Sequence, residues 1–469
     1  MIDTFRAIVG DRYLLTGADA GPWSRDYAGK IEAAPLAVAR PANTDEVAAL
    51  VRAASEAGIA IVPAGGRTGL TGATLAKEAL VISLDRMNAI REVRAEAQVA
   101  VVESGVVLSR LHDAVEAEGL VFPLTFGARG SCMVGGFLST NAGGSNVLKY
   151  GNTRDLVLGI EAVLPSGEVL DLMSELHKNN SGYDLRHLMI GAEGTLGIIT
   201  AAVLKLAPRP RAYATAMLAL PDLDTALEIL NAVQQDTGGA VEACEYMPGD
   251  YCDAYAAMRT GAGLPFDRRH EVTVMLEIGS TAPRDCDPGP DGVIPLVARL
   301  ETVLGTYLED GRLLDAVVAR TEAQRRAMWE RREAAAEVAG TRPYRVTNDV
   351  AVAVDRMGEF IDRANVAVDR ADPGSGRNIV AHLGDGNIHY TVWPTANDAA
   401  LHDRIVEAVE EIVLDMRGSF SAEHGIGSFK LNSMARRKSP VALDAMRAIK
   451  AALDPKGIMN PGKLLPPPA

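Results

Sequence analysis

The sequence predicts a mixed α+β protein that contains more than one domain. From about residue 35 to residue 206, short apolar runs alternate with helical stretches, a pattern typical of α/β architecture. After a linker signal at Ala207-Pro-Arg-Pro210, residues 213–373 mix strands such as Val272–Ile278 with helices. At 469 residues the chain is long enough for about three domains.

The first elements follow a strand–helix–strand order. Ala37–Ala39 is typical of a short strand, and Thr44–Ser55 of a helix with Thr44 as its N-cap and acids in its first turn. The next strand is expected at Ala60–Pro63.

A glycine-rich loop follows that strand directly, at Pro63–Gly72. Its four glycines let successive backbone N–H groups converge on an anion such as a pyrophosphate. The G-K-[ST] ending of a P-loop is absent, and so is the G-x-G-x-x-G pattern with a ribose-binding acid, which disfavours a Rossmann nicotinamide site. A purely structural turn is the alternative.

Two further glycine-rich segments are suited to line the same ligand-binding site as the first loop. Pro123–Gly144 packs glycine, Ser and Asn into a stretch of low charge. The third segment, Asn180–Arg186 followed by Gly191–Thr200, supplies a turn and then an acid between glycines before a strand. Three such segments predict an enclosed cofactor. Later, Gln324–Glu333 predicts a charged helix carrying Trp329, with most of its arginines on a solvated face and one a candidate to turn inward.

The run Ala381–Tyr390 predicts a hairpin that holds a metal. Asp385-Gly386 fits a two-residue loop, which would set His382 directly opposite His389, with both imidazoles within reach of one divalent ion. About forty residues later, Glu423 and His424 lie in a loop with Gly425 and Gly427, whose flexibility would let both side chains serve the same site. Ordinary surface histidines in two turns are the alternative.

Composition limits the function classes. The formal net charge of −14 argues against a nucleic-acid or anionic-membrane surface, which needs clustered Lys and Arg, and favours small-molecule chemistry. The four cysteines lack C-x-x-C spacing and are interpreted as packing residues, so no catalytic thiol is expected. No apolar run approaches the ~20 residues that span a bilayer, and no signal-peptide pattern is present, so we expect a cytoplasmic protein.

In their order along the chain, the three glycine-rich segments, the histidine hairpin and the Glu423-His424 loop resemble the FAD-dependent D-2-hydroxy acid dehydrogenases. These enzymes belong to the vanillyl-alcohol-oxidase-type flavoprotein superfamily. The resemblance runs from Pro63 to the Asp454–Lys463 ending, and His382–Asn387 with Ser421–His424 is most similar to the D-2-hydroxyglutarate branch; D-lactate and glycolate enzymes vary these motifs. It implies a two-subdomain FAD-binding domain at residues 1–208, an α+β substrate (cap) domain with the metal hairpin at 209–418, and a C-terminal segment at 419–469 that returns to the FAD site.

The resemblance also implies the cofactor-binding residues. FAD would contact the first loop, the second and third glycine-rich segments and one residue near the C-terminus, namely Pro63, Ala64, Gly65, Gly66, Arg67, Thr68, Gly69, Pro123, Gly127, Ser131, Gly135, Gly136, Ser139, Asn141, Gly143, Glu193, Gly194, Ile198, Ile199 and Asn460. Relatives with covalent flavin use a His or Cys, and the first loop contains neither. Non-covalent FAD is therefore expected.

Carried over by position, the metal ligands are His382, His389 and Glu423, and His424 is the general base that contacts substrate. A neutral imidazole can accept the substrate hydroxyl proton, while a divalent ion on that oxygen lowers its pKa and orients C2 for hydride transfer to flavin N5. Two histidines and a carboxylate fit zinc, with manganese as the alternative.

Arg332 matches the arginine that pairs with the substrate carboxylate in this family. The hydroxyglutarate branch has Thr, Lys and Asn at the positions of Ala336, Thr347 and Thr391, so three polar substrate contacts are altered here. Arg345 is the candidate to replace the missing Lys. The class is thus a D-2-hydroxy acid dehydrogenase with D-2-hydroxyglutarate as leading substrate, and D-lactate or another D-2-hydroxy acid as the alternative.

Electrons are expected to leave to an electron-transfer flavoprotein or a quinone, since no nicotinamide motif is present. Two other interpretations are weaker. An oxidase or ether-forming synthase of the superfamily would need no metal histidines, and a non-catalytic flavin or metal-binding subunit would need no intact acid and base. A homodimer is left open by the sequence.

Overall fold

The chain folds into two compact units in the computed structural model, which describes residues 1–27, 29, 31–259, 261–290 and 292–468. Unit 1 comprises residues 1–143, 151–208 and 423–469, and unit 2 comprises residues 144–150 and 209–422. Each unit therefore collects segments that lie far apart in the sequence.

Unit 1 begins with a small sheet flanked by two helices. Its described strands run in the order β1-β2-β4-β3, with β2, β4 and β3 parallel. The helix α2 buries Val47, Leu50, Val51 and Ala54, at the helical spacing predicted from the sequence. The bounds are α1 Ile2–Val9, β1 Leu14–Leu15, β2 Ala37–Ala39, α2 Thr44–Ala57, β3 Ile61–Ala64 and β4 Leu80–Ser83.

The expected N-cap of α2 is wrong by one residue. Asn43, not Thr44, accepts the Glu46 N–H at 2.9 Å, and the Glu46 carboxylate accepts the Ala42 N–H in return. Asn is at least as good an N-cap as Thr, so Asn43 caps the helix and Thr44 becomes its first residue.

The second sheet of unit 1 is antiparallel, with its described strands in the order β5-β6-β10-β8-β9. The helix α4 lies beside β10 and carries part of the second glycine-rich segment. The bounds are β5 Ile90–Arg94, β6 Val99–Glu103, α3 Leu108–Glu116, β7 Leu120–Val121, α4 Val134–Thr140, β8 Val157–Val163, β9 Val169–Leu172, α6 Leu185–Met189, β10 Ile198–Lys205 and β11 Ala207–Pro208.

The C-terminal segment returns to unit 1 and joins the edge of its first sheet. After α15 (Leu431–Arg437) and α16 (Pro440–Leu453), Met459 forms a parallel bridge with Ile61. The Ile61 N–H donates to Ile458 O at 2.7 Å, and the Asn460 N–H donates to Ile61 O at 2.8 Å. This pairing fixes Asn460 beside the strand that leads into the first glycine-rich loop.

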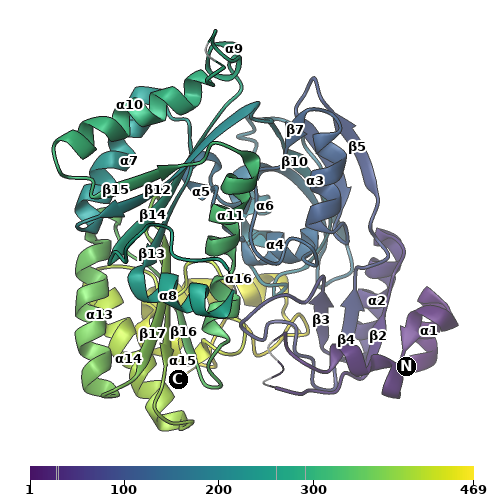
Figure 1. Cartoon of the computed structure of the whole chain (residues 1–469). Coiled ribbons are helices and arrows are strands. Elements are labelled where there is room, and N and C mark those ends of the chain that lie inside the picture. The colour runs from purple at the N-terminus through teal and green to yellow at the C-terminus, as the bar shows by residue number, and fades with distance from the viewer. Residues whose placement is uncertain (28, 30, 260, 291, 469) are drawn as a thin grey trace. The chain divides into compact units, whose positions relative to one another are not determined.

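Unit 2 is built on an antiparallel sheet whose described strands run β15-β12-β14-β13-β17-β18-β16. The helices α7, α10, α13 and α14 pack on one face, and α8, α11 and α12 pack on the other (Figure 1). The bounds are α5 Val147–Tyr150, β12 Ala212–Leu220, α7 Leu223–Thr237, β13 Val241–Pro248, α8 Gly249–Met258, β14 Val272–Ser280, α9 Pro283–Cys286, α10 Pro295–Glu309, β15 Asp315–Val318, α11 Glu322–Glu333, α12 Ala335–Ala339, β16 Val346–Ala351, α13 Met357–Ala371, β17 Gly376–His382, β18 Asn387–Trp393 and α14 Ala399–Asp415.

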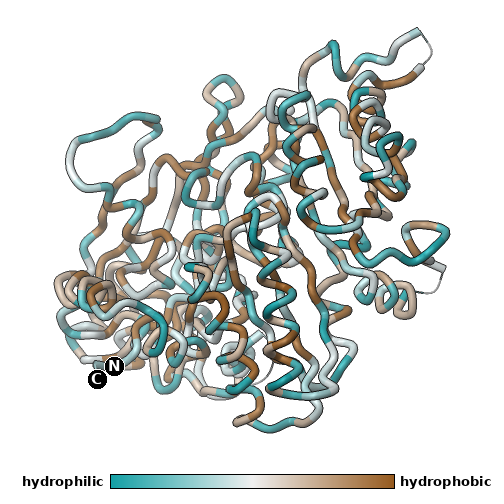
Figure 2. The backbone as a smooth tube through the Cα atoms, turned by 90° about the vertical axis from the view of Figure 1, so that its left-hand side faces the viewer, coloured by the Kyte–Doolittle hydropathy of each residue, from teal (hydrophilic) through white to brown (hydrophobic). Residues whose placement is uncertain are grey.

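The two faces of this sheet differ in chemistry. The face under α7, α10, α13 and α14 is a large apolar core, and the long helices alternate between hydrophobic and hydrophilic residues along their course (Figure 2). The face under α8, α11 and α12 is part apolar and part polar, with buried Glu245, Glu277, Asp349 and His382. Buried charges are costly unless paired, so this second face is the candidate for chemistry.

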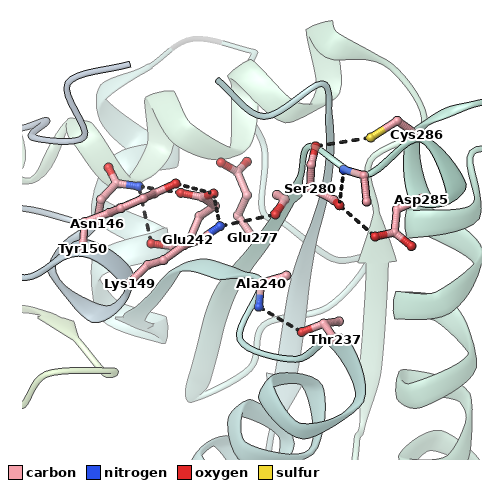
Figure 3. Close-up of polar contacts among 12 residues, drawn as sticks. Asn146, Lys149, Tyr150, Thr237, Ala240, Glu242, Glu277, Ser280, Asp285 and Cys286 are labelled. Carbon is pink, nitrogen blue, oxygen red and sulfur yellow. Dashed lines mark hydrogen bonds and ion pairs between the residues drawn. The ribbon is translucent and has the colours of Figure 1, made fainter. Parts of the chain in front are cut away.

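Residues 144–150 pack on unit 2, although they lie between two segments of unit 1. Glu242 of β13 is buried and accepts from Lys149 Nζ at 2.7 Å and from the Tyr150 hydroxyl at 3.1 Å, with Asn146 Nδ2 at 3.4 Å (Figure 3). One carboxylate therefore anchors α5 to the sheet.

Two expectations from composition can be compared with the structure. Among the described residues, no helix is long and apolar enough to cross a membrane. The four cysteines are free and buried, and burial raises the pKa of Cys132 to about 12 and of Cys252 to about 11. Thiols held in this form are poor nucleophiles, which agrees with the absence of a predicted catalytic cysteine.

Candidate functional site

Four ionisable side chains form a row across adjacent strands on the second face of the unit 2 sheet. Glu245 of β13 pairs in register with His382 of β17, and His389 of β18 pairs with Asp349 of β16. Residues paired across strands share a face of the sheet. The predicted hairpin therefore has a carboxylate on each outer side.

In this row the two imidazoles face each other. His382 Nδ1 lies 2.8 Å from Glu245 Oε1, and His389 Nδ1 lies 3.6 Å from Asp349 Oδ1. The two Nε2 atoms are 3.4 Å apart, and the ring planes are at 81°. Two ligands at about 2.0–2.1 Å from a tetrahedral metal are separated by about 3.3–3.4 Å, so the pair fits one ion.

The predicted register of the hairpin is wrong. His382 pairs with Asn387 and His389 with Val380, so the connection has four residues and the histidines are diagonal neighbours. The Leu383 N–H donates to Cys244 O of β13 instead of pairing across the hairpin, and the Asp385 side chain accepts the Asn387 N–H. Because Asn387 and His389 are two residues apart on one strand, both histidines still share a face.

Arg332 of α11 is buried at the Glu245 end of the row. Its Nε donates to Glu245 Oε2 at 2.6 Å, and its Nη2 lies 3.4 Å from His382 Nε2. Burial opposes ionisation of Glu245, but His382 and Arg332 outweigh that effect and lower the pKa of the carboxyl below its usual value. Glu245 therefore stays charged between a guanidinium and an imidazole.

The expectation that most arginines of this helix are solvated is wrong. Arg331 and Arg332 are buried, and Arg325 turns toward the sheet, whereas Arg326 is exposed. Arg325 contacts both oxygens of buried Glu277 at 2.7 Å. Acceptors that the helix sequence does not reveal hold these side chains inward: sheet carboxylates for Arg325 and Arg332, and the Gly263 carbonyl for Arg331.

Thr391 lies on β18, whereas Arg345 directly precedes the neighbouring strand β16. Thr391 is buried on β18, two residues beyond His389, and pairs with Thr347 and Asn378 on its neighbouring strands. Arg345 precedes β16 and its guanidinium lies beside Gly340, which follows the C-terminal end of α12. The paired neighbours of Thr391 are neutral, and Arg345, two residues before Thr347, is the cation predicted from the sequence for this region.

The other predicted site residues, Glu423 and His424, belong to unit 1. The Glu423 carboxylate packs against Gly143, where an added Cβ would lie 2.5 Å from Oε1, and the Thr71 hydroxyl donates to His424 O at 3.3 Å. Unit 2 ends at Ala422, whose N–H donates to Asp349 O at 3.2 Å. Glu423 is the next residue along the chain.

Unit 1 brings together the three glycine-rich segments predicted to bind a cofactor. The first loop touches the second segment backbone to backbone, because a Cβ on Gly66 would lie 2.1 Å from Ser131 O. The Glu193 N–H donates to Ser139 O at 2.8 Å, and Asn460 Nδ2 donates to Glu193 O at 2.7 Å. Gly194 lies against the side chain of Pro63, whose Cγ would be 3.0 Å from an added Cβ.

The remaining predicted cofactor residues follow the same segments. Ala64 ends β3, Gly65 to Gly69 form the loop, and Gly127 lies in the turn before α4, after Pro123. The residues Gly135, Gly136 and Ser139 lie on α4, Asn141 caps it, and Ile198 and Ile199 begin β10.

Three features of these segments fit a large anionic cofactor. Within the described chain, the N–H groups from Gly65 to Gly69 donate to no other residue, which leaves them available to an anion. Arg67, Asn141, Glu193 and Asn460 all have positive φ, an uncommon conformation that concentrates at binding sites. Buried Asn460 Oδ1 also has no hydrogen-bond partner there.

Sequence reasoning missed the two carboxylates behind the histidines, Glu245 and Asp349. Each lies inside a strand that also carries core residues: Glu245 in Val241–Pro248, beside a second acid, Glu242, and Asp349 in Val346–Ala351, after Thr347 and Asn348. Acids are seldom fully buried unless paired, so an acid within a strand that carries core residues was the available signal.

Comparison with known proteins agrees with this arrangement. Residues 35–173 match the family described as FAD binding domain, and residues 209–464 match FAD linked oxidases, C-terminal domain. A D-2-hydroxyglutarate dehydrogenase of Xanthomonas citri pv. viticola is 37% identical, over 98% of this chain and 95% of its own. A mitochondrial D-2-hydroxyglutarate dehydrogenase of Bos taurus is 34% identical, over 98% of this chain and 82% of its own.

Solved structures support the fold. The 4-ethylphenol oxidase of Gulosibacter chungangensis has a TM-score of 0.73 at 20% identity, covering 99% of this chain and 97% of its own. An alkyldihydroxyacetonephosphate synthase has a TM-score of 0.73 at 19% identity, covering 99% and 85%. The fold is thus α+β, with an FAD-binding domain of the vanillyl-alcohol oxidase type, as predicted.

The fold and the matched families define an FAD-dependent oxidoreductase that acts on CH–OH groups. Within that class, the chain belongs to the FAD-linked D-2-hydroxy acid dehydrogenases, the family of the D-2-hydroxyglutarate dehydrogenases.

Proposed function

We propose that this chain oxidises a D-2-hydroxy acid to the 2-oxo acid, with D-2-hydroxyglutarate as the leading substrate and D-lactate or another D-2-hydroxy acid as the alternative. Similarity to D-2-hydroxyglutarate dehydrogenases along nearly the whole chain supports the class. The observation that carries the proposal is the pair His382 and His389, each with a carboxylate beside Nδ1 and with Nε2 atoms 3.4 Å apart.

The ligands of the proposed metal are His382, His389 and Glu423. Metal-binding histidines commonly present the second ring nitrogen to a carboxylate, the arrangement made by Glu245 and, at longer distance, Asp349. Chain connectivity supports Glu423, because a Cα lies only ~3.8 Å from that of its neighbour, and Ala422 is hydrogen-bonded to Asp349. Bound zinc, or manganese, would lower the pKa of the substrate hydroxyl.

Non-covalent FAD would supply the two-electron acceptor for the hydrogen on C2. Its anionic part would meet the N–H groups from Gly65 to Gly69, which have no acceptor in the described chain. The Gly127–Gly143 and Glu193–Ile199 segments and Asn460 would line the rest of the site. In the proposed division into domains at residues 1–208, 209–418 and 419–469, the C-terminal segment would return to the first domain and form one wall of its FAD site.

The protein's own residues would bind and orient the acid. Arg332 would pair with its carboxylate through guanidinium N–H groups, while Glu245 holds Nε of the same guanidinium. His424 would accept the hydroxyl proton, since an imidazole is the side chain best suited to exchange a proton near neutral pH.

The distal end of the acid decides between substrates. Thr391 and its neighbours Thr347 and Asn378 carry no charge, so a second carboxylate would need Arg345 as its partner. A shorter or neutral acid such as D-lactate would need no such cation. Arg345→Ala should therefore raise KM for D-2-hydroxyglutarate and leave KM for D-lactate unchanged.

The test is anaerobic reduction of the bound flavin by D- and L-2-hydroxy acids, followed by its absorbance. Rapid bleaching by D-2-hydroxyglutarate supports the leading substrate, and a preference for D-lactate or larger apolar acids supports the alternative. Repetition after EDTA treatment, with zinc or manganese restored, tests the metal. Absence of bleaching by every D-acid would overturn the proposal.

The proposed electron acceptor is an electron-transfer flavoprotein or a quinone. A cytoplasmic location stays a prediction, since some relatives carry the name mitochondrial. Activity measured with the isolated chain and an artificial acceptor would exclude a purely structural flavin subunit.

A further inference from the structure

Glu193 is a buried acid whose carboxylate points at the loop that carries His424, within unit 1. Its Oε1 accepts the Ile426 N–H at 2.7 Å, and its Oε2 accepts the Gly427 N–H at 2.7 Å. Only 5% of the residue is exposed. Both carboxylate oxygens are thus directed to two consecutive backbone amides, two and three residues after His424.

The backbone of Glu193 is fixed as tightly as its side chain. Its N–H donates to Ser139 O at 2.8 Å, and its carbonyl accepts from Asn460 Nδ2 at 2.7 Å. Its φ of 51° is a conformation that non-glycine residues seldom adopt. Hydrogen bonds of its N–H, its carbonyl and its carboxylate hold Glu193 in this unfavourable backbone conformation. Such strained residues concentrate at functional sites.

The loop itself is shaped to receive this carboxylate. Gly425 has φ 75°, and a Cβ there would lie 2.7 Å from Glu193 Oε1. On the other side, Thr71 O accepts the N–H groups of Ser428 and Phe429 at 2.9 and 3.1 Å. The Thr71 hydroxyl also donates to His424 O at 3.3 Å. His424 is therefore flanked by two fixed supports.

We propose that Glu193 is a positioning residue that fixes the backbone of the His424 loop, so that the imidazole is held ready to take the substrate proton. The role rests on the proposed function of His424. A carboxylate suits this task because charge-assisted hydrogen bonds to amides are shorter and stronger than neutral ones. General-base catalysis is sensitive to displacements of about 1 Å, so a rigid loop contributes to rate more than to affinity.

Glu193→Gln tests the role, because an amide can accept only through its oxygen and must turn an NH2 group toward the second backbone N–H. Hydrogen exchange of Ile426 and Gly427 should accelerate roughly tenfold or more. The kcat for flavin reduction, expressed per bound flavin, should fall roughly ten- to a hundredfold, while KM stays within about twofold. This split distinguishes positioning from a general loss of folding.

Asp454→Asn is the matched control in the same unit. Asp454 is also buried and accepts two consecutive amides, Ile458 at 3.1 Å and Met459 at 2.8 Å, away from the His424 loop. Its variant should accelerate exchange at residues 458–459 and leave Ile426 and Gly427 protected.

Unchanged exchange at Ile426 and Gly427 in Glu193→Gln would overturn the proposal, and so would faster exchange with an unchanged kcat. If that variant does not fold, Gly425→Ala probes the same contact from the loop and should expose the same two amides; full protection would overturn it. If no D-2-hydroxy acid reduces the flavin of the unaltered protein, the proposed function fails, and the catalytic part of this role fails with it.

Discussion

Replacement of Glu245 by Gln is expected to weaken metal binding at His382 and His389. The Glu245 carboxylate lies 2.8 Å from His382 Nδ1, so it fixes the tautomer and orientation that present Nε2 to a metal. It also holds Arg332 at 2.6 Å. A neutral amide has one acceptor oxygen and cannot serve both partners.

The size of the effect follows from the two roles of this carboxylate. Changes to a carboxylate behind a metal-binding histidine typically reduce metal affinity by about 10- to 100-fold, or about 1.4–2.7 kcal/mol. Removing one partner of a buried ion pair also destabilises a protein by about 3–5 kcal/mol, and Gln should fall at the lower end because it keeps one hydrogen bond. Metal affinity and folding stability must therefore be measured separately.

Glu277→Gln separates the two effects. Glu277 lies on the same sheet face, is equally buried, and pairs with Arg325 of the same helix, while Trp329 Nε1 donates to it at 2.8 Å. It contacts neither histidine of the hairpin. Its variant should lose stability in urea denaturation to a similar degree and keep the metal affinity of the unaltered protein.

The assay is competition between metal-depleted protein and a chromophoric chelator for zinc, with folding verified by circular dichroism. Equal loss of affinity in both variants would show that the position of the helix, not the carboxylate behind His382, controls binding. Unchanged affinity in Glu245→Gln would refute the assigned role of Glu245.

Four further predictions use other contacts. Arg332→Lys should raise KM for the acid at least tenfold because a point charge loses the planar fork, whereas Arg331→Lys on the same helix should not; equal KM values in steady-state assays would remove Arg332 as the anchor. Guanidinium denaturation followed by filtration should release all flavin, and colour retained by the chain would contradict non-covalent binding. Native Cys132 and Cys252 should react with a chromogenic disulfide far more slowly than in denaturant, since burial raises their pKa values to about 12 and 11; prompt native labelling would contradict this. Burial raises the pKa of Glu242 in the folded state, so its contribution to stability is present below the unfolded value of about 4.3 and is lost as pH rises through the folded value; compared with Glu242→Gln, the unaltered protein should gain stability in urea titrations as pH falls from 7 toward 4.5, and parallel profiles would contradict the shift.

Local patterns were sufficient to predict several elements. The strand β2, the helix α2 and the hairpin were all expected near their observed bounds, because each has a clear periodicity or turn signal. The register of the hairpin was not predictable from its own residues. The bond from Leu383 to Cys244 decides it, and that partner lies about 140 residues away in sequence.

The carboxylates behind the histidines were missed for the same reason. Glu245 and His382 are 137 residues apart, and their pairing follows from the order of strands in the sheet. Likewise, the sequence of α11 shows four arginines without showing that Glu277 accepts from Arg325 and Glu245 from Arg332. Chemistry-bearing residue types can be found locally, whereas their partners are set by the topology.

Stability alone does not account for the buried charges on this sheet face. A well-packed apolar pair is often as stable as a buried ion pair, because desolvation offsets much of the attraction. Glu277 with Arg325 fixes the first half of α11 and contacts no histidine, whereas Glu245 with Arg332 fixes the second half and orients His382. If Glu245 served the helix alone, its contact with the imidazole would be without consequence, and the two Gln variants would behave alike. The matched pair of variants therefore tests whether one carboxylate joins the proposed substrate anchor, Arg332, to the proposed metal ligand, His382.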